Sequence, residues 1–230
     1  MEGDLSHRGQ TGSLRKLLFI SIIVIASIVS EYVDEVILSK NTPVGSDIFP
    51  PWISSVDASL FLFINVGLAN LFFGAFFQLL THLGSTFSIV MLGVALYLLG
   101  RKKEAFLIFT SILIGTMLTL PIKVLVPRPR PYVTLPSAIP LEMEAGSSFP
   151  SGHSERIFAL AIVLSKKRTK LTLPLYSLAL LVAFSRIYIG AHYPLDVAFG
   201  SLLGWVTGKI VLLYEDRFES ALKKLNVTLF

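Results

Sequence analysis

The stretch Ser185-Arg186-Ile187-Tyr188-Ile189-Gly190-Ala191-His192-Tyr193-Pro194-Leu195-Asp196 joins two strongly apolar segments of the chain. Charged residues at the edge of a membrane segment are costly, which makes them candidates for function. His192 and Asp196 lie close together if a helix begins between them, and Pro194 suits the first position of such a helix. We predict that Asp196 holds one ring nitrogen of His192 and leaves the other free to attack. Arg186 is placed to clamp an anion, so the stretch indicates a phosphoryl-transfer site.

Composition places this stretch in a membrane protein. The 230 residues are 53% hydrophobic and 15% charged, whereas soluble domains average about 25% charged residues. We therefore expect an integral membrane protein with a single domain over residues 1–230. The formal net charge of +5 is expected to come from basic cytoplasmic loops, so the expected partners are membrane lipids and not nucleic acid.

Six apolar segments predict an all-α bundle of six transmembrane helices. They follow a polar tail over residues 1–13, which we expect to be mobile and cytoplasmic. Residues 57–74 are apolar and aromatic but are interrupted by Asn65, Gly67 and Asn70. We expect this segment to form an interfacial helix in the first outer loop, with a re-entrant element as the second interpretation. The six predicted spans are about 17–33, 75–99, 105–126, 151–165, 171–189 and 194–214.

Basic residues predict how these helices are oriented. If six spans alternate, three basic clusters fall on one side of the membrane, and the 31–57 and 127–150 loops fall on the other. Basic residues collect in cytoplasmic loops. We therefore expect both termini in the cytoplasm and the stretch 185–196 at the extracytoplasmic face of the cell membrane. The clusters are Arg15-Lys16, Arg101-Lys102-Lys103 and Lys166 to Lys170.

Three polar motifs fall at the predicted outer face. They are Lys123-x6-Arg130-Pro131, Pro150-Ser151-Gly152-His153 and Ser185-Arg186-x5-His192-x3-Asp196. In order and spacing they resemble the three motifs of the type 2 phosphatidic acid phosphatase (PAP2) superfamily, over residues 123–196. The resemblance implies a membrane phosphatase that acts on lipid phosphates or diphosphates and needs neither a metal nor another cofactor.

The resemblance also implies a role for each motif residue. His192 would be the nucleophile that forms a phosphohistidine, Asp196 would orient it, and His153 would be the general acid. The phosphate would be held by Lys123, Arg130 and Arg186 together with Ser151 and Gly152.

Elementary chemistry supports these roles separately. A phosphoryl transition state spreads negative charge over its equatorial oxygens, so positioned cations supply much of the catalysis. No carboxylates or histidines have the spacing of metal ligands, and the three cations can replace a metal. Ser151 is a natural N-cap, and Gly152 lets the backbone of the following helix approach an anion. His153, in the first turn, can protonate a leaving oxygen, for which a pKa near neutrality is suitable.

Some residues near the motifs keep more than one interpretation. Arg128 is either a cationic anchor at the membrane surface or a phosphate ligand. Glu155 and Arg156 stand where the family pattern favours small or apolar residues, and they either pair with neighbouring charges or contact a headgroup. His82 is expected to pack or to form a hydrogen bond rather than to react.

The expected function is hydrolysis of a lipid phosphate at the outer face, with a polyprenyl (undecaprenyl or dolichyl) diphosphate as the first choice of substrate. Phosphatidate and phosphatidylglycerophosphate come second. A phosphotransferase with the same site is one alternative. A vanadate-dependent haloperoxidase conflicts with the membrane spans, and a non-catalytic lipid-binding protein would need no paired nucleophile and acid. The substrate is expected to enter from the outer leaflet, because extracting its tail would cost about 0.8 kcal/mol per CH₂.

Overall fold

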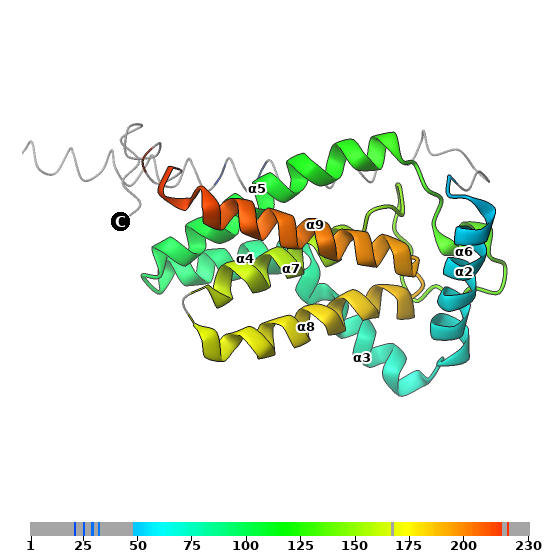
Figure 1. The fold of residues 1–230 in the computed structure, drawn as a ribbon. Coiled ribbons are helices and arrows are strands. Elements are labelled where there is room, and N and C mark those ends of the chain that lie inside the picture. Colours follow the sequence, from blue (N-terminus) through cyan, green and yellow to red (C-terminus); the bar gives the residue numbers. More distant parts are fainter. Residues whose placement is uncertain are drawn as a thin grey trace, which may run out of the picture.

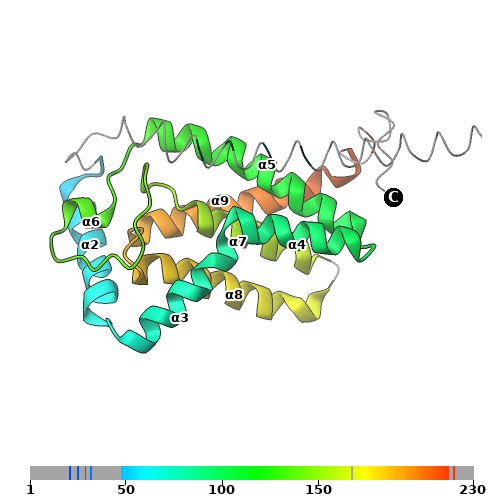
Figure 2. The same cartoon turned by 180° about the vertical axis from the view of Figure 1, so that it is seen from behind.

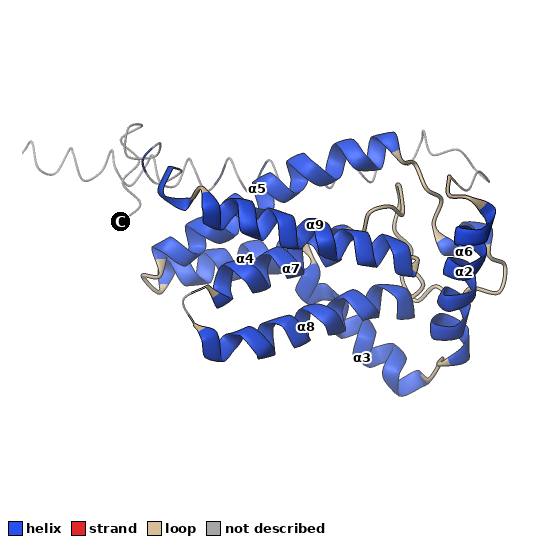
Figure 3. Ribbon diagram, viewed as in Figure 1, coloured by secondary structure: helices blue, strands red, loops and turns tan. Residues whose placement is uncertain are grey.

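The computed structural model describes residues 48–166 and 168–217, together with the single positions 21, 25, 29, 32 and 220. The regular structure of this part is entirely helical, and most of its helices run along one elongated bundle (Figures 1 and 3). The predicted tail over 1–13 lies outside the described residues, as does nearly all of the predicted first span over 17–33. The prediction of an all-α fold is confirmed for the described part.

Ten helical elements with defined bounds follow one another over residues 51–213. Most are α-helices, whereas η3 is a short π-helix and η4 is a single 3₁₀ turn. The elements are α2 (Pro51–Leu62), η3 (Phe63–Gly67), α3 (Leu71–Thr81), η4 (His82–Gly84), α4 (Thr86–Leu98), α5 (Lys102–Leu125), α6 (Pro131–Thr134), α7 (Gly152–Ser165), α8 (Thr169–Tyr188) and α9 (Pro194–Leu213).

Three of the described helices are long and apolar enough to cross a membrane. These are α5, α8 and α9, and they coincide with the predicted spans over 105–126, 171–189 and 194–214. The predicted span over 151–165 is present as α7, but its 14 residues rise only about 21 Å at 1.5 Å per residue. A hydrocarbon core is about 30 Å thick. A count of six full spans therefore remains a prediction.

The prediction of one continuous helix over 75–99 is wrong, because η4 and Ser85 divide it into α3 and α4. Ser85 has extended backbone angles, and its hydroxyl caps the new helix by accepting from the Ser88 N–H at 3.2 Å. Gly84 lies against α7 and α8 so closely that a β-carbon there would come within 2.8 Å of a Val182 methyl and 3.2 Å of the His153 Cβ. The chain thus breaks where close packing requires glycine and a serine can start the next helix.

A sharper bend separates α2 and η3 from α3. The chain bends by 116° between the two arms, which together qualify as a broken span or a re-entrant loop. Asn70 makes the second arm possible, since its side chain accepts from the N–H of Phe72 at 2.9 Å and so caps α3. The helix begins at Pro51, earlier than predicted, and α2 lies across one end of the bundle (Figure 2). An orientation along the membrane surface, as the sequence predicted for 57–74, remains a prediction.

Helix α7 lies inside the bundle and packs against α5, α8 and α9. Its contact with α9 follows small residues at every fourth position, Gly200, Gly204 and Gly208. A β-carbon at Gly200 or Gly204 would collide with backbone oxygens of α7, so the two helices approach to backbone contact there. This contact fixes the start of α7 beside the start of α9.

The two ends of the bundle carry different polar groups. At the end where α5 begins, Glu215 pairs with Lys103 at 2.6 Å and also with Lys166, and Arg101 pairs with Glu104 at 2.9 Å. The starts of α7 and α9 and the end of α8 lie at the opposite end (Figure 1). The basic residues at 101–103 and the described ones of the 166–170 cluster are therefore separated from the stretch 185–196 along the bundle.

Candidate active site

The predicted site residues gather at the end of the bundle that α2 crosses. The ends of α5 and α8 meet the starts of α7 and α9 there, and the loop between α6 and α7 covers them (Figure 1). Most of the charged groups are buried, which in a protein interior requires specific partners. The buried members are Asp57, Lys123, Arg128, Arg130, Arg186, His192 and Asp196.

The ring of His192 is held at one nitrogen and open at the other. Its Nδ1 lies 2.7 Å from the carbonyl oxygen of Ser148, and the carboxylate of Asp196 is farther away, at 3.7 Å. A proton on Nδ1 therefore has the Ser148 carbonyl as its nearest acceptor, which leaves the lone pair of the ring on Nε2. That atom faces Arg130, with 3.4 Å between Nε2 and Nη1.

Asp196 acts on this ring indirectly. One of its oxygens accepts from the hydroxyl of Ser148 at 2.5 Å and from the N–H of Tyr193 at 2.9 Å. The other accepts from Arg128 at 2.6 Å. The sequence placed Asp196 on a ring nitrogen of His192, and the structure brings its carboxylate within 3.7 Å of Nδ1, with the Ser148 carbonyl as the nearer acceptor. No sequence pattern could have identified Ser148, because its main contribution is a backbone oxygen.

Arg128 is buried, whereas a surface anchor would be exposed, and its guanidinium is directed at carboxylates of the chain. It is 1% exposed and pairs with Asp57 at 2.7 Å as well as with Asp196. Its guanidinium lies 3.9 Å from the centre of the Tyr193 ring and 4.8 Å from that of Phe49. These contacts place Arg128 behind the histidine, where it connects α2 to the start of α9.

Asp57 is a site residue that sequence reasoning missed. Besides pairing with Arg128, it accepts from the N–H of Leu195 at 2.9 Å, in the first turn of α9. The available signal was a carboxylate inside an apolar helix, where charge is rare and usually paired. The segment was interpreted as a surface helix, which gave that carboxylate no partner.

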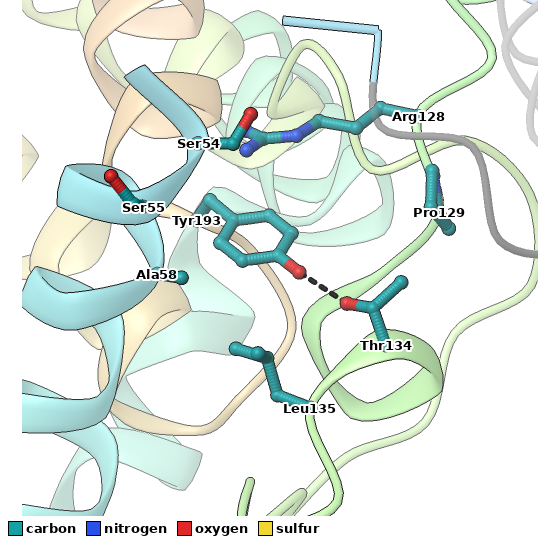
Figure 4. A pocket seen from close by; sticks show the side chains of 8 residues that line it. All are labelled: Ser54, Ser55, Ala58, Arg128, Pro129, Thr134, Leu135 and Tyr193. Atoms are coloured by element: carbon teal, nitrogen blue, oxygen red, sulfur yellow. Dashed lines mark hydrogen bonds between the residues drawn. The ribbon is translucent and has the colours of Figure 1, made fainter. Parts of the chain in front are cut away.

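A cavity of about 300 Å³ opens beside this network, between α2 and α6 (Figure 4). The hydroxyls of Tyr193 and Thr134 meet across it at 2.5 Å. The lining includes none of Arg130, Arg186, His153 or His192, so this cavity is not the anion site. It is lined by Ser54, Ser55, Ala58, Arg128, Pro129, Thr134, Leu135 and Tyr193.

The anion site lies between Arg130 and Arg186, and a carboxylate of the chain itself occupies it. Glu144 pairs with Arg130 at 2.9 Å and with Arg186, and its Oε2 is 3.9 Å from Nε2 of His192. Arg186 also donates to the hydroxyl of Thr81 at 2.8 Å and lies 3.4 Å from Glu142. Arg130 also donates to two backbone oxygens, those of Ala191 and Ala145. We call these two arginines, with His192, the phosphate cradle, after the role that the sequence predicts for them.

The remaining predicted residues lie at the end of α5 and at the start of α7. Lys123 lies at the end of α5, and its Nζ is 3.3 Å from the carbonyl oxygen of Ser147. Ser151 caps α7 as predicted, with its hydroxyl accepting from the Ser154 N–H at 3.4 Å, and its own N–H donates to the Asp196 carbonyl. Gly152 and His153 form the first turn of α7. The ring of His153 is within electrostatic range of Arg186, Glu144 and His192.

The charges around the phosphate cradle set two protonation states. Burial lowers the pKa of His192 to about 4, against the opposing effect of its contact with Asp196. The imidazole is therefore neutral at pH 7 and its Nε2 lone pair is available. Burial alone would raise the pKa of Glu144, but Arg186 and Arg130 hold that pKa well below its usual range. Glu144 is thus an anion in the resting protein.

Comparisons with known proteins point in the same direction. The model of the PAP2 superfamily matches residues 104–219. Undecaprenyl-diphosphatase BcrC of Bacillus subtilis is 36% identical over 90 residues, which make up 38% of this chain and 46% of that protein. Decaprenylphosphoryl-5-phosphoribose phosphatase of Mycobacterium tuberculosis is 35% identical over 117 residues, 51% of this chain and 64% of that protein. Among solved structures, Aquifex aeolicus LpxE has a TM-score of 0.64 at 32% identity, covering 69% of this chain and 96% of that one.

The fold and the site together define a helical membrane protein with a histidine beside a buried anion-binding site. The chain belongs to the PAP2 superfamily, which confirms the resemblance seen in the three motifs. The match spans less than half the length of BcrC, at 46% of that protein.

Proposed function

We propose that this protein is a lipid phosphate phosphatase that works through a phosphohistidine on His192 and requires no metal. The observation that carries the proposal is the position of Nε2, which faces an anion site built from two buried arginines. The phosphate cradle can hold a phosphoryl group against this lone pair and neutralise the charge that develops on its oxygens. The relatives named as phosphatases support the same reaction type.

The reaction has two steps. In the first, Nε2 of His192 attacks phosphorus, the bond to the leaving oxygen breaks, and His153 gives its proton to that oxygen. In the second, His153 takes a proton from water, the water oxygen attacks the phosphohistidine, and inorganic phosphate leaves as the P–N bond breaks. Arg130 and Arg186 hold the phosphoryl oxygens in both steps, assisted by Lys123 and the first turn of α7 at Ser151 and Gly152. Asp196 keeps the ring in place through Ser148.

A polyprenyl diphosphate is the substrate that we propose first, with phosphatidylglycerophosphate and phosphatidate second. BcrC is named for a polyprenyl diphosphate, and a relative from Haemophilus influenzae is named phosphatidylglycerophosphatase B. The phosphate cradle lies where α8 ends and α9 begins, so a lipid phosphate can reach it while the tail stays among the lipids. We further propose that this end faces outward and that both termini are cytoplasmic.

The test is a panel of lipid phosphates given to the purified full chain in detergent micelles, with release of inorganic phosphate as the readout. The panel contains undecaprenyl diphosphate, phosphatidylglycerophosphate, phosphatidate and glycerol phosphate, each with and without EDTA. We expect turnover that survives EDTA, is inhibited by vanadate, and is lost in His192→Ala. Turnover that EDTA abolishes and Mg²⁺ restores would refute the metal-free mechanism. Transfer of the phosphoryl group to another lipid, with no release of free phosphate, would show that the protein is a phosphotransferase and not a hydrolase.

A further inference from the structure

Glu144 stands where a substrate phosphate has to bind. Its two oxygens contact Arg130 and Arg186, and one of them lies 3.9 Å from the nucleophilic nitrogen of His192. A phosphoryl group placed against Nε2 would need the same guanidinium groups and the same space. Two anions cannot share them without strong repulsion in a buried site. Substrate and Glu144 are therefore alternatives.

The carboxylate is an incomplete ligand for the phosphate cradle. The Nε atoms of Arg130 and Arg186 are both buried, and neither has a hydrogen-bond partner among the described residues. A carboxylate offers two oxygens, whereas a phosphoryl group offers three and carries more charge. A phosphate can therefore satisfy donors that Glu144 leaves unpaired, and unpaired buried donors are costly. This difference gives a phosphate the means to displace the carboxylate.

The side chain of Glu144 can leave while its backbone stays in place. The side chain is 28% exposed, so it has a way out toward solvent. Its backbone is anchored at two consecutive carbonyls: that of Glu144 accepts from the Tyr132 hydroxyl at 2.5 Å, and that of Ala145 accepts from Arg130 at 2.9 Å. Exchange then requires rotation of one side chain and no movement of the loop.

We propose that Glu144 is an internal competitor for the phosphate cradle, which occupies it between turnovers, yields to the substrate and returns as inorganic phosphate departs. The inference rests on the proposed function in taking a phosphate as the ligand. A competitor built into the chain lowers the affinity for every anion by the same factor, because each anion binds only the fraction of the protein in which the cradle is open. If Glu144 fills the cradle about nine-tenths of the time, affinities fall about tenfold.

The experiment compares the wild-type chain with Glu144→Gln in detergent, using isothermal titration with inorganic phosphate and with orthovanadate. Glutamine keeps the size of the side chain and removes its charge. We expect the Kd of both anions to fall by a common factor of about ten, and kcat/KM for the lipid substrate to rise by that factor. Glu104→Gln is the matched control, since it removes a carboxylate from Arg101 at the other end of the bundle and should leave both Kd values unchanged.

Several results would overturn the inference. An unchanged or higher Kd in Glu144→Gln would mean that the carboxylate supports the arginines and does not compete. Unequal factors for phosphate and vanadate would mean that it contacts the ligand. If Glu144→Gln folds poorly, Glu144→Ala provides the same comparison, as does a wild-type structure with vanadate, in which Glu144 should have left both arginines. Because titration needs no turnover, a wild-type protein that binds phosphate but hydrolyses no lipid would refute the proposed function and leave this inference standing.

Discussion

Arg128 and Asp57 form a buried ion pair, with 2.7 Å between Nη2 and Oδ2 and side chains that are 1% and 2% exposed. The same guanidinium reaches Asp196 at 2.6 Å. One arginine thus pairs with two carboxylates, one on α2 and one on α9. Since Asp196 in turn accepts from Ser148 and from the N–H of Tyr193, the pair connects α2 to the loop that carries His192.

This network predicts that Arg128 affects the rate more than substrate affinity. Arg128→Met should leave two buried carboxylates unpaired and lower the free energy of unfolding by about 3–5 kcal/mol. It should also lower kcat while KM changes little, because the guanidinium of Arg128 is directed at Asp57 and Asp196. Thermal unfolding and steady-state kinetics in detergent would measure both effects.

The matched control for Arg128 is Asp57→Asn, which keeps the arginine on Asp196 and should be the milder change. If Arg128→Met instead raised KM strongly and spared kcat, Arg128 would be a phosphate ligand.

The indirect contact between Asp196 and His192 predicts unequal effects of their substitutions. His192→Ala should abolish phosphate release. Asp196→Asn should leave measurable activity, because the nearest acceptor for Nδ1 is the Ser148 carbonyl, which stays in place. Labelled phosphate trapped on the protein after acid-free quenching would report the intermediate, and it should accumulate in His153→Ala. Full activity in His192→Ala would rule out this nucleophile.

Arg186 should be irreplaceable by lysine. Its guanidinium contacts Thr81, Glu142 and Glu144 together, and an ammonium group cannot reproduce that geometry. Arg186→Lys should weaken orthovanadate binding about 10- to 100-fold, as expected for a lost charge-assisted hydrogen bond of about 1.5–3 kcal/mol. Both proteins should carry Glu144→Gln. Otherwise Arg186→Lys would also weaken the contact with the competing carboxylate of Glu144, and the two effects on vanadate binding would overlap. Equal vanadate affinities would mean that Arg186 does not bind the anion.

The low pKa of His192 predicts how activity depends on pH. The groups that face its ring are Asp196, Arg130, Arg186 and Glu144, and burial is the largest cause of the shift to about 4. The folded protein thus keeps a neutral ring well below the ordinary value of about 6.5. We expect the acid limb of kcat/KM that belongs to this histidine to lie nearer pH 4 than pH 6.5.

The low pKa of His192 also predicts the behaviour of Glu144→Gln and the dependence of stability on pH. Glu144 raises the pKa of His192, so Glu144→Gln should move the acid limb to lower pH. Because the folded pKa is depressed, the unfolded chain binds more protons below about pH 6.5, and this histidine destabilises the fold as the pH falls toward 4. A pH series of activity and of thermal unfolding would test both. An acid limb near 6.5 in the wild type would contradict the buried, neutral ring.

Long apolar segments and their caps made much of this fold predictable. Helices α5, α8 and α9 follow from uninterrupted apolar runs, and Ser151 starts α7 where a capping residue precedes one. The break at Ser85 was not predictable in this way, because the reason for it is the contact of Gly84 with two other helices. Local sequence carries no record of such contacts.

The site was predictable to the extent that its residues belong to motifs. Arg130, Arg186 and His192 meet as the motif spacing required. The partners outside the motifs could not be assigned, since Asp57 and Glu144 come from segments whose position depends on the tertiary fold. A carboxylate beside an arginine-rich site has no sequence signature that separates a ligand from a competitor.

Two arginines that converge in an empty, buried site would repel each other, and Glu144 removes that repulsion before any substrate exists. We therefore expect Glu144, the proposed competitor of phosphate, to help the newly made chain fold in the membrane. Glu144→Gln, which should strengthen phosphate binding, should therefore reduce the yield of correctly folded protein. Phosphate or vanadate added during refolding should restore that yield. A carboxylate at position 144 would thus favour folding and weaken phosphate binding, a trade-off common at functional sites.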